Sequence, residues 1–258
     1  MSHSDPVAVA SIDSSARLVV LARSIRVTES AGESALLDGA AEAAGECETC
    51  LGAAVYRHRR SYDGAAEPPG WTHVEFRYFR DLLPATAVEA LVSEPMVPAL
   101  RLLRAEVLLT SPESFHLPGD WRGSAQRPEL QASLEYIQVK QVQLARYREV
   151  MRDYCGPAAR NLVRARRVGT FRAMETAAVL YQDPDFHADW NQIHLCELNP
   201  DTFEGFGPAF TSALRDDPLR SATIAESFAG LPAIRSLPYW TLNAPLVEDD
   251  SALLGLAG

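Results

Sequence analysis

Two short segments of the chain alternate for most of their length between apolar and polar residues. The first spans residues 71–80 and reads WTHVEFRYFR. Its Val74, Phe76 and Tyr78 share one face, and polar side chains share the other. The second spans residues 190–198 and reads WNQIHLCEL, with the same alternation. A period of two is typical of a strand with one buried face, so both segments are predicted to be strands.

Apolar runs and helix-forming runs predict the remaining elements. Clusters of β-branched and other apolar residues indicate further strands. These strands are predicted at residues 17–27, 53–62, 107–110, 134–144, 170–181 and 234–242. Segments rich in Ala, Glu, Leu and Arg favour helices. These helices are predicted at residues 33–51, 84–103 and 146–166, with a break at Gly156-Pro157, and from Pro200 onward.

The order of the predicted elements repeats, so that both halves read strand-helix-strand-strand-helix-strand. Three pairs of landmarks recur at a spacing of 116 to 119 residues: Leu18 and Leu134, Trp71 and Trp190, and Pro84 and Pro200. Such a unit forms a four-stranded antiparallel sheet with helices on one face, and its other face must be covered. The sequence therefore predicts an α+β fold of two ferredoxin-like repeats whose sheets form an intrachain pseudo-dimeric α+β barrel.

Proline and glycine content suggests where the two repeats are joined. Residues 111–128 hold three prolines and two glycines, which favour a connecting segment. The expected organisation is a disordered tail at 1–15, a repeat at 16–110, a linker at 111–130, a repeat at 131–243 and a tail at 244–258. The second repeat is expected to be catalytic, because its strands are better formed and its pocket-facing residues carry fewer charges.

Composition excludes several classes of protein. The chain has 258 residues, of which 47% are hydrophobic and 22% are charged, as in an ordinary globular protein. Its net charge of −10 argues against a nucleic-acid partner. We find no apolar run long enough to span a membrane, no signal peptide and no dense cysteine framework, so a cytoplasmic location is expected. The fingerprints of serine hydrolases, zinc proteases and tightly bound dinucleotides are also missing from the sequence.

The strand order, the Trp-led third strands and the WNQIHLCEL segment carry a family resemblance. The chain resembles the dimeric α+β-barrel superfamily, and within it the antibiotic-biosynthesis monooxygenase-like branch. Tandem members of that branch include the oxygenases that open ring B of angucyclines in the jadomycin, gilvocarcin and kinamycin pathways. The resemblance implies an oxygenase that acts on an aromatic polyketide with O2. It further implies reduced flavin (FADH2 or FMNH2) as a diffusible co-substrate from a separate flavin reductase, or no cofactor.

His194 is the first candidate for chemistry. It shares a strand face with Gln192 and Cys196. An imidazole there is suited to act as a general base toward a phenol, and the alternative is a hydrogen-bonded core histidine. Tyr136 shares a face of the preceding strand with Gln138 and Lys140. That face either lines the pocket, with Tyr136 catalytic and Gln138 and Gln192 in contact with substrate, or forms a sheet-to-sheet interface.

Aromatic side chains are the second group of candidates. Trp190 and Trp240 are suited to stack on a flat polycyclic substrate, and the alternative for both is a place in the core. Phe206 and Phe210 belong to an apolar helical stripe, which is either core or the wall of a substrate cavity. In the first half, His73 is assigned the place that matches His194, either with a catalytic role or in an ion network with its neighbours.

Two other functions stay open at this point. The first is a haem protein of the same superfamily, for which His194 and His187 are the candidate axial ligands. The second is a non-redox polyketide cyclase or binding protein on the same scaffold, since a fold does not determine a function. The C-x-x-C at Cys47 and Cys50 lacks a second ligand pair, so no metal is expected. A homodimer is compatible with all three functions.

Overall fold

We describe a computed structural model of the chain. The description covers residues 9–11, 17–46, 49–62, 69–93, 97–118, 131–187, 189–198, 212, 231–249 and 253. Across these ranges, no helix combines the length and the apolar character that crossing a membrane would require.

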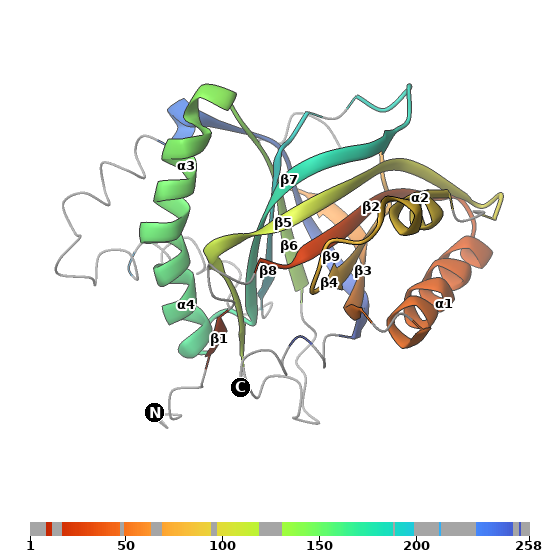
Figure 1. Cartoon of the computed structure of the whole chain (residues 1–258), viewed down its shortest axis with the longest axis horizontal. Coiled ribbons are helices and arrows are strands. Elements are labelled where there is room, and N and C mark those ends of the chain that lie inside the picture. The colour runs from red at the N-terminus through yellow and green to blue at the C-terminus, as the bar shows by residue number, and fades with distance from the viewer. Residues whose placement is uncertain are drawn as a thin grey trace.

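Nine antiparallel strands form one sheet that closes into a barrel (Figure 1). The strands of the first half are β1 (Val9–Ser11), β2 (Val19–Val27), β3 (Cys50–Ser61), β4 (His73–Phe79) and β5 (Leu100–Pro118). The strands of the second half are β6 (Gln131–Val139), β7 (Thr170–Gln182), β8 (Gln192–Leu198) and β9 (Arg235–Asp249). The order is β1-β5-β2-β4-β3-β9-β6-β8-β7, and a further pairing of β7 with β5 closes the ring.

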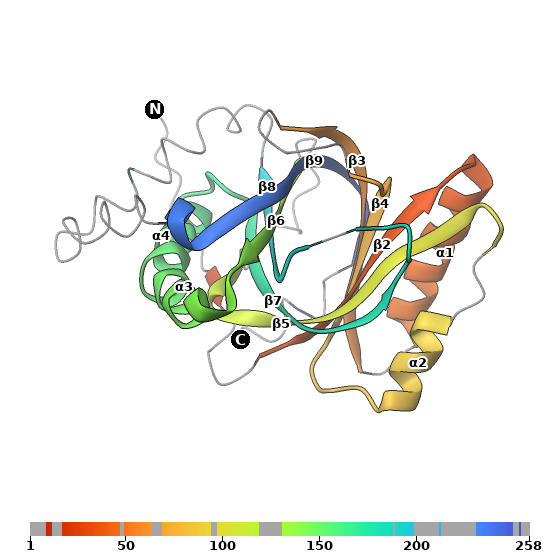
Figure 2. The ribbon, with the colours of Figure 1, turned by 90° about the horizontal axis from the view of Figure 1, so that it is seen from above.

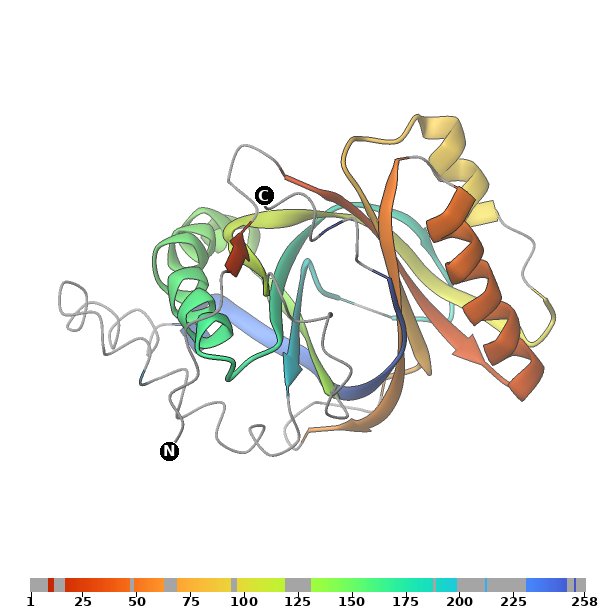
Figure 3. The same ribbon diagram turned by 90° about the horizontal axis from the view of Figure 1, so that it is seen from below.

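Helices cover the barrel from outside, on two opposite sides (Figures 2 and 3). On one side lie α1 (Ser30–Glu46) and α2 (Ala85–Ser93). On the other side lie α3 (Leu144–Val150), a π-helical turn (Met151–Cys155) and α4 (Gly156–Arg164), which form one continuous helical segment. The predicted α+β class, with an antiparallel sheet and packed helices, is confirmed.

The strand alternation explains why the core is divided into layers. One apolar cluster fills the barrel. In it Trp71 and Trp190 contact each other, and both contact Tyr136 and Phe186, with ring centroids 4.7 to 6.1 Å apart. Separate clusters lie between the sheet and its outer helices, and the largest of them packs β6, β7 and β8 against α3 and α4. Burying both faces of a strand removes more apolar surface from water than burying one face.

The barrel interior also holds charges that are paired. Arg172 donates from Nη1 to the hydroxyl of Tyr78 at 2.8 Å, and its Nη2 lies 3.6 Å from Glu197 Oε1. Tyr56 donates to the same carboxylate oxygen at 2.9 Å. Both ionic side chains are fully buried. A buried charge is tolerated only when it is paired and hydrogen-bonded, so these contacts make the two halves of the chain depend on each other.

The elements differ from the expectation in three places. The helix predicted to end at residue 103 ends at Ser93. β5 continues to Pro118 through eight residues of the expected linker, because β7 and β1 pair with this end of the strand. Residues 9–11 of the expected tail form β1, and β9 runs to Asp249, past the expected end of the second repeat. The remaining residues of the N-terminal tail lie outside the described part of the chain.

The Gly156-Pro157 break is also absent, because a π-helical turn precedes it. Proline removes one backbone donor from a helix, and a widened turn accommodates that loss. Gly156 lies against β5, where a Cβ atom would come within 2.0 Å of Glu113 O and 2.7 Å of Ser114 Oγ. Its carbonyl oxygen also accepts a hydrogen bond from His116 Nε2 at 2.9 Å. Only glycine allows this approach of helix to strand.

We expect Gly156→Ala to lower the free energy of unfolding by roughly 1–3 kcal/mol, since the methyl group must displace backbone. Gly39→Ala is the matched control, because nothing lies within 4 Å of its added Cβ in the middle of α1. That control should gain roughly 0.5–1 kcal/mol from helix propensity. Urea unfolding of both variants measures the difference, and equal stabilities would contradict the close approach.

Candidate functional site

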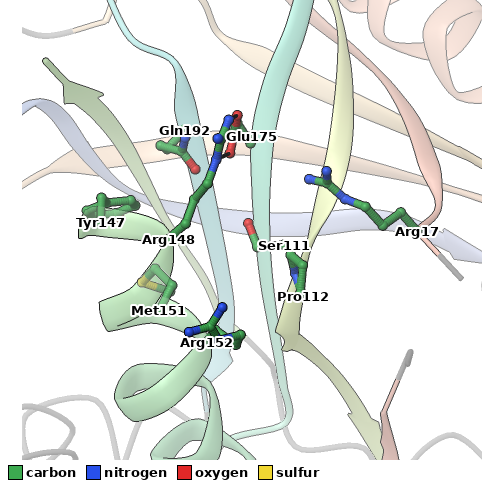
Figure 4. A pocket seen from close by; sticks show the side chains of 9 residues that line it. All are labelled: Arg17, Ser111, Pro112, Tyr147, Arg148, Met151, Arg152, Glu175 and Gln192. Carbon is green, nitrogen blue, oxygen red and sulfur yellow. Dashed lines mark hydrogen bonds and ion pairs between the residues drawn. The ribbon is translucent and has the colours of Figure 1, made fainter. Parts of the chain in front are cut away.

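A cleft of about 270 Å³ opens between the helical segment and the strands β5, β7 and β8 (Figure 4). It lies outside the barrel, on the face that α3 covers. Its lining residues are Arg17, Ser111, Pro112, Tyr147, Arg148, Met151, Arg152, Glu175 and Gln192. The lining thus combines one phenol, one buried amide, three guanidinium groups and one carboxylate.

A bulge in β5 builds one wall of this cleft. Thr110 pairs with Met174 and Phe115 pairs with Arg172, so four residues of β5 stand opposite a single residue of β7. Within the bulge, Glu113 has a left-handed backbone with φ of 56°. Such bulges bend a strand and redirect its side chains. The bulge places Ser111 and Pro112 at the cleft.

The bulge also holds the π-helical turn in place. Ser114 donates from Oγ to the carbonyl oxygen of Met151 at 3.0 Å. The same carbonyl also accepts from the backbone N–H of Gly156 in the widened turn, so the Ser114 bond is an additional link from strand to helix. Met151 and Arg152 belong to that turn and line the cleft. The hydrogen bond from Ser114 to Met151 therefore connects the part of the cleft that β5 lines with the part that the helical turn lines.

Tyr147 connects the cleft to His194. The Tyr147 hydroxyl lies 3.1 Å from His194 Nε2, and the two rings stack with centroids 6.2 Å apart. On the other side of the imidazole, Nδ1 lies 3.7 Å from Glu135 Oε2. Arg235 Nη1 in turn lies 4.0 Å from that same carboxylate oxygen. We call Tyr147, His194 and Glu135 the relay, because the phenol can pass a proton to the imidazole and the carboxylate can stabilise the imidazolium that results.

Burial sets the protonation states of this relay. It lowers the pKa of His194 below the ordinary value, although Glu135 acts in the opposite direction. It also raises the pKa of Tyr147 far above the ordinary value. Burial opposes ionisation of Glu135, but His194 and Arg235 together hold the pKa of that carboxyl below its usual range. At neutral pH the relay is therefore a protonated phenol, a neutral imidazole and a carboxylate, with His194 Nε2 accepting from Tyr147.

Three arginines surround the cleft, and they differ in their partners. Arg148 makes a two-pronged ion pair with Glu175, and this pair lowers the pKa of the half-buried carboxyl against the effect of burial. Arg152 pairs with its neighbour Asp153 at 2.7 Å. Arg17 donates from Nε to the carbonyl oxygen of Thr110 at 2.8 Å, which fixes its position.

The structure brings some of the sequence candidates together and separates others. His194 and Gln192 share the helix-covered face of β8, as the alternation predicts, and Gln192 lines the cleft. Tyr136 instead points into the barrel, against Trp71 and Trp190. The sheet itself separates it from His194, so the two do not form one catalytic site.

The other aromatic candidates lie apart from the cleft. Trp190 is buried in the barrel and donates from Nε1 to Glu106 at 2.8 Å, which is the core alternative. Trp240 stacks on Tyr62 with centroids 4.3 Å apart and donates to Ser133. Gln138 does not line the cleft. Phe206 and Phe210 lie outside the described residues.

His73 does not occupy the place that matches His194. It is the first residue of β4, whereas His194 is the third residue of the equally long β8. Its Nε2 lies 2.8 Å from Glu33 Oε2 on α1, and its Nδ1 lies 2.9 Å from Thr72 Oγ1. It takes no part in the buried network of Glu75 with Arg23 and Arg77, which is the ion network that the sequence alternative suggests for its neighbours.

The sequence analysis missed two members of the relay, Glu135 and Tyr147, and the neighbouring Arg235. Glu135 pairs with His194 across β6 and β8, and it shares a face with the apolar Ile137. A lone charge on an apolar face was a signal that could have been read. Tyr147 and Arg235 gave no such signal, because their contacts depend on how α3 and the start of β9 meet the sheet.

Comparison with known proteins shows a shared fold. No protein-family model matches the chain, and no curated protein matches it in sequence. An anthrone oxidase-like protein aligns with a TM-score of 0.53 and 10% identity over 95% of this chain and 96% of its own. A mutant chlorite dismutase from Candidatus Nitrospira defluvii aligns with a TM-score of 0.49 and 14% identity over 93% and 95% of the two chains. A heme-binding protein from Thermus thermophilus aligns with a TM-score of 0.44 and 13% identity over 98% of both.

The burial of neutral His194 predicts a pH dependence of stability. Its pKa is lower in the folded than in the unfolded protein, so the unfolded chain binds more protons as the pH falls below about 6.5. The free energy of unfolding should therefore fall by up to about 1.4 kcal/mol per pH unit for this one group. His194→Gln should be less stable at pH 7 and should show a shallower fall toward pH 5.

Chemical denaturation from pH 7.5 to 5 measures both slopes. The wild-type slope also contains His73 and His116, whose pKa values burial lowers as well, so only the difference between the proteins reports on His194. Exposed His187→Gln controls for the loss of one imidazole. Parallel curves for the wild type and His194→Gln would show that His194 is not held neutral.

Proposed function

We propose that this protein is an oxygenase that acts on a phenolic aromatic compound bound in the cleft beside Tyr147. The observation that carries this proposal is the chain of contacts from Tyr147 to His194 and Glu135. A buried neutral imidazole backed by a carboxylate is suited to accept a proton. Tyr147, at the phenol end of that chain, is one of the residues that line the cleft.

The first step of the proposed reaction is a proton transfer. As Tyr147 takes the proton of the bound substrate phenol at its oxygen, its own proton passes to His194 Nε2. The imidazolium is then stabilised by Glu135 at Nδ1, and the substrate is left as an electron-rich phenolate. Tyr147 is the candidate catalytic residue, whereas His194 and Glu135 act through it. Activation of the substrate matters because O2 reacts slowly with closed-shell organic molecules.

The second step consumes O2, and two balanced forms are compatible with the cleft. In the first, reduced flavin from a separate reductase supplies two electrons, one oxygen atom enters the product and the other leaves as water. In the second, the substrate supplies all electrons, so that an activated CH2 becomes C=O with release of water. An anthrone carries such a CH2 group, and the fold likeness to an anthrone oxidase-like protein supports this form. Aromatic polyketides are the substrate class that we propose for both.

The described residues do not fit a haem. Both ring nitrogens of His194 face protein groups, Nε2 toward Tyr147 and Nδ1 toward Glu135. His187 is exposed. The other described histidines bond to protein groups at other places in the fold.

We further propose that the chain consists of two ferredoxin-like units, about 16–110 and 131–243, with the second one catalytic. The strand order supports this, because β5-β2-β4-β3 in one half and β9-β6-β8-β7 in the other follow the same pattern. In each half the first strand lies between the fourth and the third. A pseudo-dimeric barrel of this kind has no need of a partner chain to cover its sheets, so a homodimer would use other surfaces.

The proposed function predicts O2 consumption with 1,8-dihydroxyanthrone as the probe, above the rate of the uncatalysed reaction. An oxygen electrode, with and without a flavin reductase and NADH, separates the two forms. His194→Gln and Tyr147→Phe should each lower the enzymatic rate by about 10²–10⁴-fold, as expected for the loss of acid–base catalysis. Tyr181→Phe, at an exposed tyrosine on β7, is the matched control.

Each other outcome points to a different function. Substrate loss without O2 consumption would replace the oxygenase with the non-redox cyclase. A Soret band in the spectrum of the purified protein would replace it with a haem enzyme. Full activity in both relay variants would remove the cleft beside Tyr147 as the site.

A further inference from the structure

We infer that the ligand of this cleft carries an anionic group, a carboxylate or a phosphate, and that Arg17 binds it. The inference rests on the proposed function only in taking the cleft as the substrate site. It begins from charge: three of the nine lining residues are arginines and one is a carboxylate, in a chain whose net charge is −10. A local excess of positive charge in an acidic protein needs a counter-charge.

Within the part of the chain that the structure describes, Arg17 is the lining arginine that forms no ion pair of its own. Arg148 is neutralised by Glu175, and Arg152 by Asp153. Arg17 donates through Nε to the carbonyl oxygen of Thr110, a neutral acceptor, so its charge is not balanced there. Arg17 also acts electrostatically on Glu175, but that carboxylate is already paired with Arg148.

Arg17 is also held rigidly. The backbone of Leu18 donates to Thr110 Oγ1 at 3.0 Å, and Thr110 donates back to the Leu18 carbonyl at 3.1 Å. These contacts fix the chain over the start of the β5 bulge, and the Nε bond fixes the guanidinium. An arginine that is ordered before binding loses little entropy when its remaining donors meet a carboxylate or phosphate.

The layout of the cleft places the two ends of such a ligand. Figure 4 shows Arg17 and Tyr147 on opposite sides, with Ser111 between them. A phenol placed against Tyr147 therefore directs a substituent on its far side toward Arg17. Because the cleft is small, a polycyclic substrate enters only in part, with its phenol toward Tyr147 and its anionic substituent toward Arg17. The inferred ligand is an aromatic hydroxy acid or the phosphate of a flavin.

Paired probes distinguish these two sources and test the charge itself. The first pair is 1-hydroxy-2-naphthoate and its neutral amide, and the second is FMN and riboflavin. Binding to the full chain is measured by fluorescence titration without turnover. Arg17→Gln should weaken binding of at least one anion about tenfold, the size of one charge-assisted contact, and leave its neutral partner unchanged. The affected pair identifies the source.

Two further variants keep the test decisive. Arg146→Gln removes an exposed arginine of α3 that pairs with Glu149 and does not line the cleft, so it should change no affinity. Arg17→Lys keeps the charge and should recover part of the lost affinity even if Arg17→Gln folds poorly. Equal loss of acid and amide, or no loss of either anion, would overturn the inference. A wild type that binds an anion through Arg17 but consumes no O2 would refute the oxygenase alone.

Discussion

Hydrogen bonding between β5 and β7 joins the two ends of the sheet, and this closure gives every strand an inward and an outward face. Adjacent residues then belong to different layers. Tyr136 packs among aromatic rings inside the barrel, while Glu135 faces His194 beneath α3. Among the described residues, apolar side chains and paired ions such as Arg172 and Glu197 pack the inside. The cleft proposed as the substrate site lies on the outward face, beside α3.

The cleft exists because two regular elements are irregular at the same place. β5 bulges where it passes the π-helical turn, and Ser114 joins the two. A regular strand and a regular helix would pack closely and leave no space for a ligand. The relay next to the cleft is built the opposite way, since ordinary strand register places Glu135 beside His194. A rigid relay beside an irregular cleft is a suitable combination for holding a proton path steady while a substrate enters.

The sequence predicted local structure better than it predicted the site. Alternation identified the strands at 71–80 and 190–198 and placed His194 with Gln192, because a period of two is a local property. It failed for β5, whose prolines and glutamates look like a loop until pairing on both edges is known. The role of Tyr147 could not be predicted either, because only the packing of α3 on the sheet brings this side chain to His194. Tyr136 was misplaced because alternation divides residues into two faces without saying which face is inside.

The π-helical turn separates the orientation of α3 from that of α4. Each residue of a helix rotates the chain by about 100°, so one added residue in the turn offsets everything before it relative to everything after it. α4 is fixed against β5 by Gly156, whereas the cleft-lining side chains come from the turn and from α3. The length of the turn therefore sets which face of α3 points to the sheet. Lengthening or shortening the turn by one residue would present a different set of α3 side chains while Gly156 and α4 keep their place on β5. One scaffold could acquire new specificities in this way.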